Sequence, residues 1–438
     1  ISGSSATNTI TFKPAVGGDV ILTSSSTNAT LRFNAASNII FDGSNNGTNS
    51  RDMHIINSAT TTNTAAIWVS SQGTNLGSEN ITLKNLKVKA GVNSVTSTFG
   101  IISSGTTIST SATGAHNNNL KIENNLVERA YYGIYARGVA STGLLTGLEI
   151  KNNTIGSDIQ ADYVLFRGID IQNATAPLIE GNNIFNMKMS TAASNAAIDL
   201  GANVTGALVS KNKISGIHST SSSGYGAYGV NISATTTDNI TIVNNMISDL
   251  LTINYAHGVT FHAFGIRITG GTNHKVYYNS VNLSGTPTGG SGAGMSAALI
   301  VTATTPTGLD VRNNIFSNST EFAGTTGRAY AVYSASAAVF ANINYNNYFS
   351  TGNNAMLGYL TSDRVDLTAW RLATGSDLNS LATNPFFTTP DILHPIASAL
   401  DGAATPITSV TDDFEGNLRD PLTPDIGAIE FTPLPGGD

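Results

Sequence analysis

A short phrase that recurs along most of the chain constrains the fold more than any other feature of the sequence. The phrase is an aliphatic residue, a variable residue, a polar pair that usually contains Asn, and then a further aliphatic residue. Its fourth position falls at Leu86, Asn125, Asn153, Asn182, Asn212, Asn245, Asn279 and Asn314. Successive copies lie 28 to 39 residues apart. A period of that size is typical of proteins built from stacked structural repeats.

A second phrase recurs with the same period. It consists of a small residue, an aliphatic, a variable residue and an aliphatic, as in Gly133–Ala136, Gly168–Ile171, Ala197–Leu200 and Gly229–Ile232. Both phrases are too short for helices, and they alternate with the period of two that strands show. Strands that recur once per repeat stack best on their own copies in the next repeat. The sequence therefore predicts an all-β fold, a single-stranded parallel β-helix (β-solenoid) of about nine or more rungs with aliphatic columns inside.

The recurring asparagines have a structural explanation. Asn tolerates the left-handed backbone conformation that a sharp turn between strands requires. Side-chain amides stacked at the rung spacing can also hydrogen-bond to one another as a ladder. We therefore predict turns and a ladder at these positions, and we assign no catalytic role to them.

Composition excludes several classes of protein. The 21 basic and 28 acidic side chains give a formal net charge of −7, which argues against a nucleic-acid partner because phosphate binding needs clustered Lys and Arg. Hydrophobic residues reach 40% and charged residues only 11%, the reverse of a disordered chain. Cysteine is absent, so neither disulfides nor thiolate metal sites hold the fold together. The longest aliphatic run, residues 297–301, is too short to span a bilayer, so no transmembrane segment is expected.

Segments near the two ends of the chain carry a recognisable pattern. They are Asn8–Pro14, Asn38–Ser44, Leu367–Trp370 with the Gly375, Asp377, Ser380, Pro385 and Phe386 that follow, Asp413–Arg419 and Pro424–Phe431. With the repeat between them, these segments resemble the secreted right-handed parallel β-helix proteins of bacteria, the superfamily that includes pectate lyases, and especially surface and exported proteins of the Bacteroidetes type. The resemblance covers nearly the whole chain. It implies a right-handed β-helix with N- and C-terminal caps, and a secreted or bacterial cell-surface location. Known members include enzymes and adhesins, so the resemblance constrains the fold more than the function.

The predicted organisation has three parts. Residues 1–37 form an N-terminal cap and first coils, residues 38–350 the parallel β-helix, and residues 351–438 a C-terminal capping segment and the start of a linker. In the last part we expect a short helix over residues 365–374 and apolar plugs at Trp370, Phe386 and Phe387, because an open solenoid exposes unpaired backbone at its ends. The chain opens at Ile1 without Met, so we expect a processed product or a piece of a longer polypeptide.

The variable residue of the second phrase points outward if its aliphatic neighbours point inward. Rung by rung, this outer column reads Trp68, Ile102, Tyr135, Asp170, Asp199, Asn231, Arg267, Ile300 and Tyr333. Aromatic, carboxylate, amide and guanidinium groups on one face are typical of a polysaccharide-binding strip. We therefore take Trp68, Tyr135, Asp170, Asp199, Asn231, Arg267 and Tyr333 as candidate ligand-binding residues.

Asp170 and Asp199 are the candidates for chemistry, with Arg267 as a third. On adjacent rungs the two carboxylates would lie roughly 5 Å apart, where they share a proton, bind a cation such as Ca²⁺, or turn into solvent. A separation of roughly 5 to 5.5 Å is also that of retaining glycosidases. The alternative is an ordinary solvated outer face whose charge Arg267 and bulk ions offset.

Motifs of known enzymes are largely missing. His257-Gly258 matches one element of the polygalacturonase site, but neither Asn-x-Asp nor Arg-x-Lys occurs, and Asp412-Asp413 falls in the terminal segment. His257 and His262 lie in one insertion without the further ligands of a firm metal site, so we expect loop residues there. No cofactor is expected apart from the Ca²⁺ alternative at Asp170 and Asp199.

Three functions stay open. The leading hypothesis is an extracellular or cell-surface structural or adhesive β-helix protein, which contacts polysaccharide or assembles with further copies of itself and does not catalyse a reaction. The second is a polysaccharide lyase or glycoside hydrolase acting on the outer face around Asp170 and Asp199. The third is a trimeric protein of the tailspike kind.

Overall fold

The computed structural model describes residues 4–253, 262–288, 294–322 and 326–433. It is an all-β, parallel β-solenoid of about 10 turns, consistent with a right-handed β-helix, so the predicted fold class is confirmed. The chain divides into two compact units. Unit 1 contains residues 1–187 and 198–208, and unit 2 contains residues 188–197 and 209–438.

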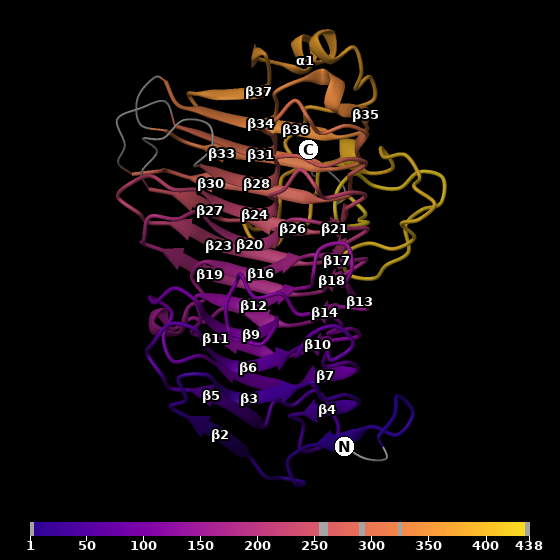
Figure 1. Ribbon diagram of the computed structural model, residues 1–438. Coiled ribbons are helices and arrows are strands. Elements are labelled where there is room, and N and C mark those ends of the chain that lie inside the picture. The colour runs from indigo at the N-terminus through magenta and orange to yellow at the C-terminus, as the bar shows by residue number, and fades with distance from the viewer. Residues whose placement is uncertain (1–3, 254–261, 289–293, 323–325, 434–438) are drawn as a thin grey trace. The chain divides into compact units, whose positions relative to one another are not determined.

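Each turn of unit 1 contributes one strand to each of three parallel sheets, here called sheets A, B and C (Figure 1). Sheet A contains β1 (Ile10–Phe12), β4 (Ile39–Asp42), β7 (Ile81–Lys84), β10 (Lys121–Glu123), β14 (Glu149–Lys151) and β18 (Leu178–Glu180). Sheet B contains β2 (Val20–Ser24), β5 (Met53–Asn57), β8 (Leu86–Lys89), β11 (Leu126–Glu128) and β15 (Thr154–Ile155). Sheet C contains β3 (Ala29–Asn34), β6 (Thr64–Ser70), β9 (Thr98–Ser104), β12 (Tyr132–Arg137) and β16 (Arg167–Gln172). A small sheet adds β13 (Leu145–Thr146), β17 (Ala174–Thr175) and β21 (Val204–Thr205).

Unit 2 repeats this arrangement. Its sheet A contains β25 (Thr241–Val243), β29 (Lys275–Tyr277), β32 (Leu309–Arg312) and β35 (Phe340–Asn344). Its sheet B contains β23 (Lys213–Ser219), β26 (Met246–Ser248), β27 (Leu250–Thr252), β30 (Ser280–Gly285), β33 (Ile315–Thr320) and β36 (Asn347–Ser350). Its sheet C contains β24 (Ala227–Ile232), β28 (Ala263–Ile268), β31 (Met295–Val301), β34 (Arg328–Ser334), β37 (Ala355–Leu360) and β38 (Ser362–Arg364). Strands β19 (Asn183–Met189), β20 (Asn195–Leu200) and β22 (Leu208–Ser210) contain residues of both units.

The strand register follows the sequence repeat. Ile150 pairs with Ile122 on one side and Ile179 on the other, and Ile134 pairs with Ile169. These side chains are fully buried, because inward positions on successive strands stack in columns along a parallel solenoid. The repeat predicted from the sequence is therefore the structural turn.

The asparagine ladder exists. The sequence analysis gave the ladder and the left-handed turn to the same residue, but in the structure they fall on two adjacent residues. In unit 1 the side-chain amide of Asn125 donates to Asn153 and that of Asn153 to Asn182, each at 3.0 Å. In unit 2 the ladder runs Asn212, Asn245, Asn279, Asn314 and Asn346, with amide contacts of 2.9 to 3.0 Å. The left-handed conformation falls one residue earlier in the chain, at Asn85, Asn124, Asn152, Asn244 and Asn313 among others. The ladder side chains point inward and are buried.

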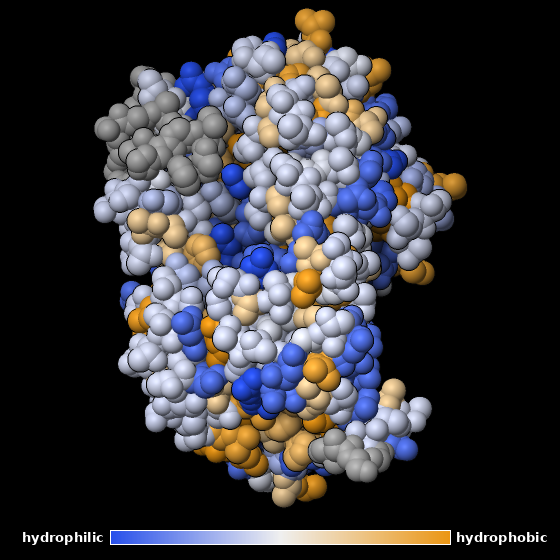
Figure 2. All heavy atoms as spheres, in the orientation of Figure 1, coloured by the Kyte–Doolittle hydropathy of each residue, from blue (hydrophilic) through white to orange (hydrophobic). Residues whose placement is uncertain are grey.

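Parallel pairing includes the first coils predicted within residues 1–37 and continues past residue 350. Strand β1 already pairs with β4, and β37 still pairs with β34. The first coil carries exposed apolar side chains, Phe12 at 44%, Ile21 at 60% and Leu22 at 38%. Figure 2 shows hydrophobic atoms gathered at the end of unit 1 where Figure 1 places β2. The first coil is thus a regular coil with an exposed apolar edge.

The last coil of unit 2 is covered. The described residues contain a single α-helix, α1 (Leu367–Thr374), which confirms the helix predicted over residues 365–374. Trp370 on α1 is fully buried and donates to Asp377 at 2.7 Å, and its ring lies 6.1 Å from that of Tyr348 in β36. Phe386, expected to be a plug, is 45% exposed, so that prediction is wrong. Phe387 is partly buried among apolar side chains of the C-terminal segment.

The C-terminal segment, residues 381–433, lies along the side of unit 2 (yellow in Figure 1). It contacts the asparagine turns: Asn313 exchanges hydrogen bonds with Thr405 at 2.8 and 3.1 Å, and Gly427 donates its amide to the Asn313 carbonyl at 2.8 Å. Ala428 donates to Ser280 at 3.0 Å. Among the residues that the structure describes, no helix has the length and apolarity needed to cross a membrane.

Candidate functional site

The outer column predicted from the second phrase exists in both units. On sheet C of unit 1, Trp68 pairs with Ile102, Ile102 with Tyr135, and Tyr135 with Asp170. On sheet C of unit 2, Asn231 pairs with Arg267, Arg267 with Ile300, and Ile300 with Tyr333. The period of two therefore placed these residues correctly on one face of each unit.

Solvent reaches little of this column. Trp68 is 1%, Tyr135 0%, Asp170 7% and Asp199 4% exposed, and Asn231 is 2% exposed. In unit 1 part of the cover is the chain that follows β9. The Tyr135 hydroxyl donates to the Thr110 carbonyl at 2.7 Å, and Ile108 packs against Trp68 and Tyr135. The column of unit 1 is therefore packed rather than solvated, whereas Arg267 and Tyr333 of unit 2 are partly exposed.

A second outer column, which the sequence analysis missed, is aromatic. In unit 1 the rings of Phe99 and Tyr132 stack with centroids 5.0 Å apart, and in unit 2 those of Tyr228 and Phe264 stack 5.8 Å apart. The sequence does carry a signal: each of these residues directly precedes the small residue of the second phrase. Neighbouring side chains of a strand point to opposite faces. The ring therefore points outward, next to the small residue, and stacks on the ring of the adjacent strand.

The two carboxyl groups singled out from the sequence lie in one electrostatic cluster of unit 1. Arg167 Nε lies 2.8 Å from Asp199 Oδ2, and its guanidinium lies 3.8 Å over the ring of Phe166. Burial above all, and then the charge of Asp199, raise the pKa of Asp170 to about 7 against the opposing effect of Arg167. Gln172 donates to Asp170 at 3.4 Å. Burial thus favours the neutral form of Asp170, and Asp199 is held by its ion pair with Arg167.

Neighbouring tyrosines respond to the same cluster. Burial raises the pKa of Tyr132 and of Tyr135, and the negative charge of Asp170 adds to the effect. Both phenols therefore stay protonated at physiological pH, and Tyr135 uses its proton in the hydrogen bond to the Thr110 carbonyl.

The donor set does not fit Ca²⁺. That ion takes six to eight oxygen ligands, whereas Asp199 already forms an ion pair with Arg167 and burial favours the neutral form of Asp170. No cluster of three or more His, Cys, Asp or Glu side chains suited to a metal occurs in the part of the chain that the structure describes.

The predicted residues of unit 2 pair with their own neighbours. Arg267 donates to Asn231 at 2.9 Å and lies 4.9 Å from the centre of the Tyr228 ring. Tyr333 stacks on Tyr359 with centroids 4.4 Å apart. These side chains form a layered polar and aromatic surface in which one residue supports the next.

Of the two histidines in the insertion, the structure describes His262. His257 and Gly258 lie outside the described residues. His262 is fully buried, with its ring edge-on to Phe264 and centroids 6.4 Å apart. Packing against an aromatic ring is what a structural histidine does.

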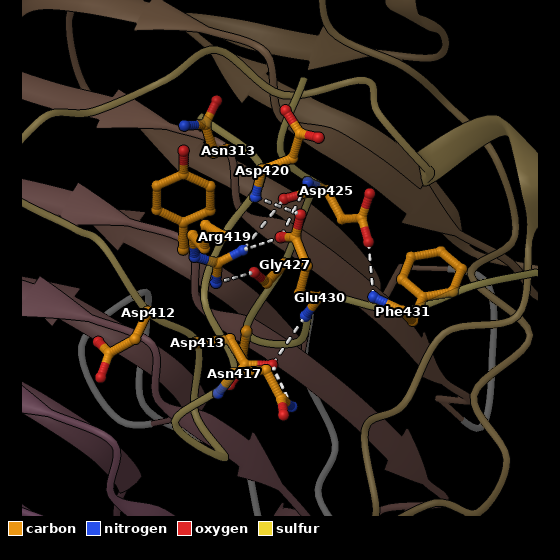
Figure 3. A network of polar contacts seen from close by, with 12 residues as sticks. Asn313, Asp412, Asp413, Asn417, Arg419, Asp420, Asp425, Gly427, Glu430 and Phe431 are labelled. Atoms are coloured by element: carbon orange, nitrogen blue, oxygen red, sulfur yellow. Dashed lines mark hydrogen bonds and ion pairs between the residues drawn. The ribbon is translucent and has the colours of Figure 1, made fainter. Parts of the chain in front are cut away.

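A buried arginine in the C-terminal segment is the group that the sequence analysis passed over (Figure 3). Arg419 is 7% exposed and lies 3.9 Å over the ring of Tyr278. It donates to Asn244 Oδ1 and to the Gly427 carbonyl, each at 2.9 Å, and forms an ion pair with Glu430 at 3.1 Å. Its signal in the sequence was the segment Asp413–Arg419, which was recognised as a motif and given no chemistry.

Two carboxylates shape the backbone around Arg419. Asp413 is fully buried and accepts hydrogen bonds from the amides of Glu415, Asn417 and Glu430 at 2.8 to 3.0 Å. Asp425 accepts from the amides of Gly402 at 2.7 Å and Phe431 at 2.6 Å. Asp412-Asp413 is thus part of the terminal segment, as the sequence indicated, and Asp412 forms an ion pair with Lys211 at 2.6 Å.

Comparison with known proteins does not place the chain in a family. Neither a protein-family model nor a curated protein sequence matches the chain. Among solved structures, one match is PfbA, a surface adhesin of Streptococcus pneumoniae, at 12% identity and a TM-score of 0.42 over 78% of this chain and 81% of that one. A match at this level identifies no function.

Proposed function

We propose that this chain is an extracellular or cell-surface protein with a structural and adhesive role, which binds polysaccharide through the partly exposed side chains on the outer face of sheet C in unit 2 and does not cleave it. The observation that carries the proposal is the state of the carboxyl pair. Asp199 is neutralised by Arg167 at 2.8 Å, and Asp170 is 7% exposed. Groups in this state stabilise packing and are poorly placed to reach a substrate.

The stacked aromatic and amide side chains support the same role. Sugars bind to aromatic faces flanked by a few oriented polar groups. The partly exposed Tyr333 and Tyr359, with the partly exposed Arg267 two strands away, offer that combination. A solenoid also holds such groups at a fixed rung spacing, so a repetitive polymer meets a repetitive surface.

A glycan array and a turnover assay test the proposal together. The purified chain should be retained on at least one class of polysaccharide and should release no cleavage product from a panel of acidic and neutral polysaccharides. Tyr333→Ala should weaken retention, whereas Leu372→Ser, at an 87% exposed position on α1, should leave it unchanged. Absence of any retention would overturn the proposal.

One observation favours a polysaccharide lyase or hydrolase instead. The pKa of Asp170, raised to about 7 by burial and by Asp199, is that of a general acid working near neutral pH. Product release that Asp170→Asn abolishes would establish this function, provided that Asp19→Asn, at an exposed position in the first coil, retains it.

A further inference from the structure

Two adjoining hollows lie on the C-terminal segment of unit 2. The first has a volume of about 450 Å³ and is lined chiefly by apolar side chains, among them Tyr278, Pro406, Ile407, Val410, Leu418 and Pro421. The second has a volume of about 510 Å³ and is lined by Asp401, Asp420, Asp425 and Glu430. Leu418, Arg419, Asp420 and Pro421 line both, so these residues form a shared wall.

The apolar hollow has an exposed apolar rim. Leu418 is 80% exposed and lies in the wall, and Leu422, close by in sequence, is 79% exposed. Single exposed leucines are common on protein surfaces. An exposed leucine in the wall of an apolar hollow is different, because a partner side chain that enters the hollow also covers the leucine.

The second hollow carries negative charge that the protein does not neutralise. Four carboxyl groups line it, those of Asp401, Asp420, Asp425 and Glu430, and its basic lining residue is Arg419. Arg419 is itself neutralised by Glu430 at 3.1 Å. Asp401 and Asp420 are exposed, and their carboxylates remain available to a cation.

The walls are formed before any partner arrives. Asp425 holds the amides of Gly402 and Phe431, and Glu430 accepts from the amides of Asp420 at 2.9 Å and Asp425 at 3.2 Å (Figure 3). Hollows held by such hydrogen bonds lose little conformational entropy on binding.

We propose that these two hollows form a docking site for a polypeptide segment in which a large apolar side chain stands next to Lys or Arg. The apolar side chain enters the hollow lined by Tyr278 and Ile407, and the cation lies against Asp401 and Asp420. The charge decides between partner classes: phosphates and acidic polysaccharides are repelled, and a neutral glycan leaves the carboxylates uncompensated. This inference goes beyond the proposed function and does not rest on sheet C.

Synthetic peptides test the site directly. Four labelled nine-residue peptides carry Leu-Lys, Ala-Lys, Leu-Gln or Leu-Glu at the centre of a Gly/Ser sequence, and fluorescence anisotropy measures their binding to the whole chain. The Leu-Lys peptide should bind saturably, the Ala-Lys and Leu-Gln peptides about tenfold more weakly, and the Leu-Glu peptide weaker still.

Paired variants locate the site. Leu418→Ser and Asp401→Asn should each weaken the Leu-Lys peptide by about fivefold or more. Their controls are Leu372→Ser, at an exposed leucine of α1, and Asp391→Asn, at an exposed aspartate outside both hollows, and both should bind as the unchanged chain does. All four positions are exposed, so thermal unfolding should confirm an intact fold.

Two results would overturn the proposal. One is equal binding of the Ala-Lys and Leu-Lys peptides, which would mean attraction of any cation to an acidic protein. The other is Leu-Lys binding that Leu418→Ser and Asp401→Asn leave unchanged, or no saturable binding at all. Neither result bears on retention by polysaccharides.

Discussion

Both units have an asparagine turn between sheets A and B. In each unit an arginine donates to a turn asparagine, but the arginine comes from a different part of the chain. In unit 1, Arg51 comes from the chain that joins β4 to β5 and donates to Asn124 Oδ1 at 2.9 Å. In unit 2, Arg419 comes from the C-terminal segment and donates to Asn244 Oδ1, also at 2.9 Å. Both asparagines have the left-handed conformation and directly precede a ladder residue.

The two arginines differ in their surroundings. Arg51 is partly exposed, and the turn of unit 1 borders a polar hollow of about 470 Å³ lined by Asp42, Lys84, Glu123 and Lys151 among others. Arg419 is buried and stacked on Tyr278. Unit 1 therefore leaves its turn to water, whereas unit 2 covers its turn with 50 or so residues of irregular chain.

The residue at the left-handed position explains the difference. In unit 1 it is Asn85, Asn124, Asn152 or Gly181, but unit 2 has Tyr278 and Tyr345 among its turns. A tyrosine there exposes a large ring unless something packs on it, and Arg419 packs on Tyr278. The ladder asparagine therefore determines where the chain turns in both units. The residue before it determines whether another segment of the chain must pack on the turn.

Removing a ladder amide should have the largest effect, and it should be the same in both units. Asn279→Ala removes amide donation to Ile242, Tyr277 and Asn314 and leaves Asn245 without its acceptor. Several buried polar groups lose their partners, so we expect a loss of about 4 kcal/mol in the free energy of unfolding. Asn153→Ala should lose a similar amount, and urea unfolding measures both.

The exposed Asn49 provides the control for this pair. Asn49→Ala should change the free energy of unfolding by less than about 0.5 kcal/mol. If Asn153→Ala proved nearly neutral while Asn279→Ala did not, the ladder would not be the shared element, and the comparison between the units would fail.

The arginine that finishes each turn should show the difference between the units. Arg419→Ala removes the stack on Tyr278 and leaves Glu430 without its ion pair, so we expect a loss of about 3 kcal/mol. Arg51→Ala breaks hydrogen bonds at a half-solvated site, so a loss of about 1 kcal/mol is expected. Thermal and urea unfolding of both variants measure the contrast.

A double-mutant cycle sharpens this test. The coupling between Arg419→Ala and Asn244→Ala should exceed that between Arg51→Ala and Asn124→Ala, because burial strengthens a charge-assisted hydrogen bond. Equal couplings would show that the cover adds nothing to the contact.

The periodic part of the molecule was predictable because each turn repeats the same physical problem. Ile150, Ile179 and Asn153 recur at one spacing, so their places in the core and the ladder follow from the sequence. Arg51 and Arg419 do not recur, and their partners lie 73 and 175 residues away. No local pattern encodes such contacts.

The candidate site shows the same division. Its alignment on sheet C was predictable from the alternation of Asp170 with its aliphatic neighbours, and the stacking is confirmed. Its burial was not, because the cover around Thr110 is a Ser/Thr-rich loop whose sequence has no periodicity. The ion pair of Arg167 with Asp199 could not be predicted from the column of variable residues, because Arg167 is not a member of that column.

Titration should separate the two turns by the sign of its effect. Burial raises the pKa of Asp42 in unit 1, but hydrogen bonds from Asn85, from the Ser44 amide and from Lys84 outweigh it and lower the pKa below its ordinary value. Burial above all, and then the charges of Glu430 and Asp401, raise the pKa of Asp425 in unit 2 to about 6, against hydrogen bonds from the amides of Phe431 and Gly402.

The consequences for stability are opposite. Asp42 stabilises the fold above its ordinary pKa, and this contribution is lost as pH falls through its lowered value. Asp425 binds its proton more tightly in the folded chain, so its contribution falls as pH rises from about 4 to about 6 and is constant above that range. We expect the contribution of Asp425 to the free energy of unfolding to fall by about 1 kcal/mol over this range.

Stability curves from pH 3 to 8 for the unchanged chain, Asp42→Asn and Asp425→Asn measure these effects. The difference between the unchanged chain and Asp425→Asn should decline between pH 4 and 6, whereas the difference from Asp42→Asn should grow as pH rises from 3. Each substitution also changes hydrogen bonding by an amount independent of pH, so the shape of the curve is the test. Parallel curves would contradict the assignment.

Removal of surface ion pairs should change the free energy of unfolding least, and a small difference between the two units should still be measurable. Glu180 and Lys151 in unit 1 lie 3.6 Å apart with both side chains about a third exposed, so Glu180→Gln should cost about 0.3 kcal/mol. Asp412 and Lys211 lie 2.6 Å apart and join the C-terminal segment to the turn of unit 2, so Asp412→Asn should cost about 0.7 kcal/mol. High salt screens exposed charges, and both costs should therefore shrink in 1 M salt. Equal losses for Asp412→Asn and Glu180→Gln at low salt would contradict this expectation. The C-terminal segment would then be held by Arg419 and Tyr278, and the ion pair at its edge would contribute nothing to the difference between the units.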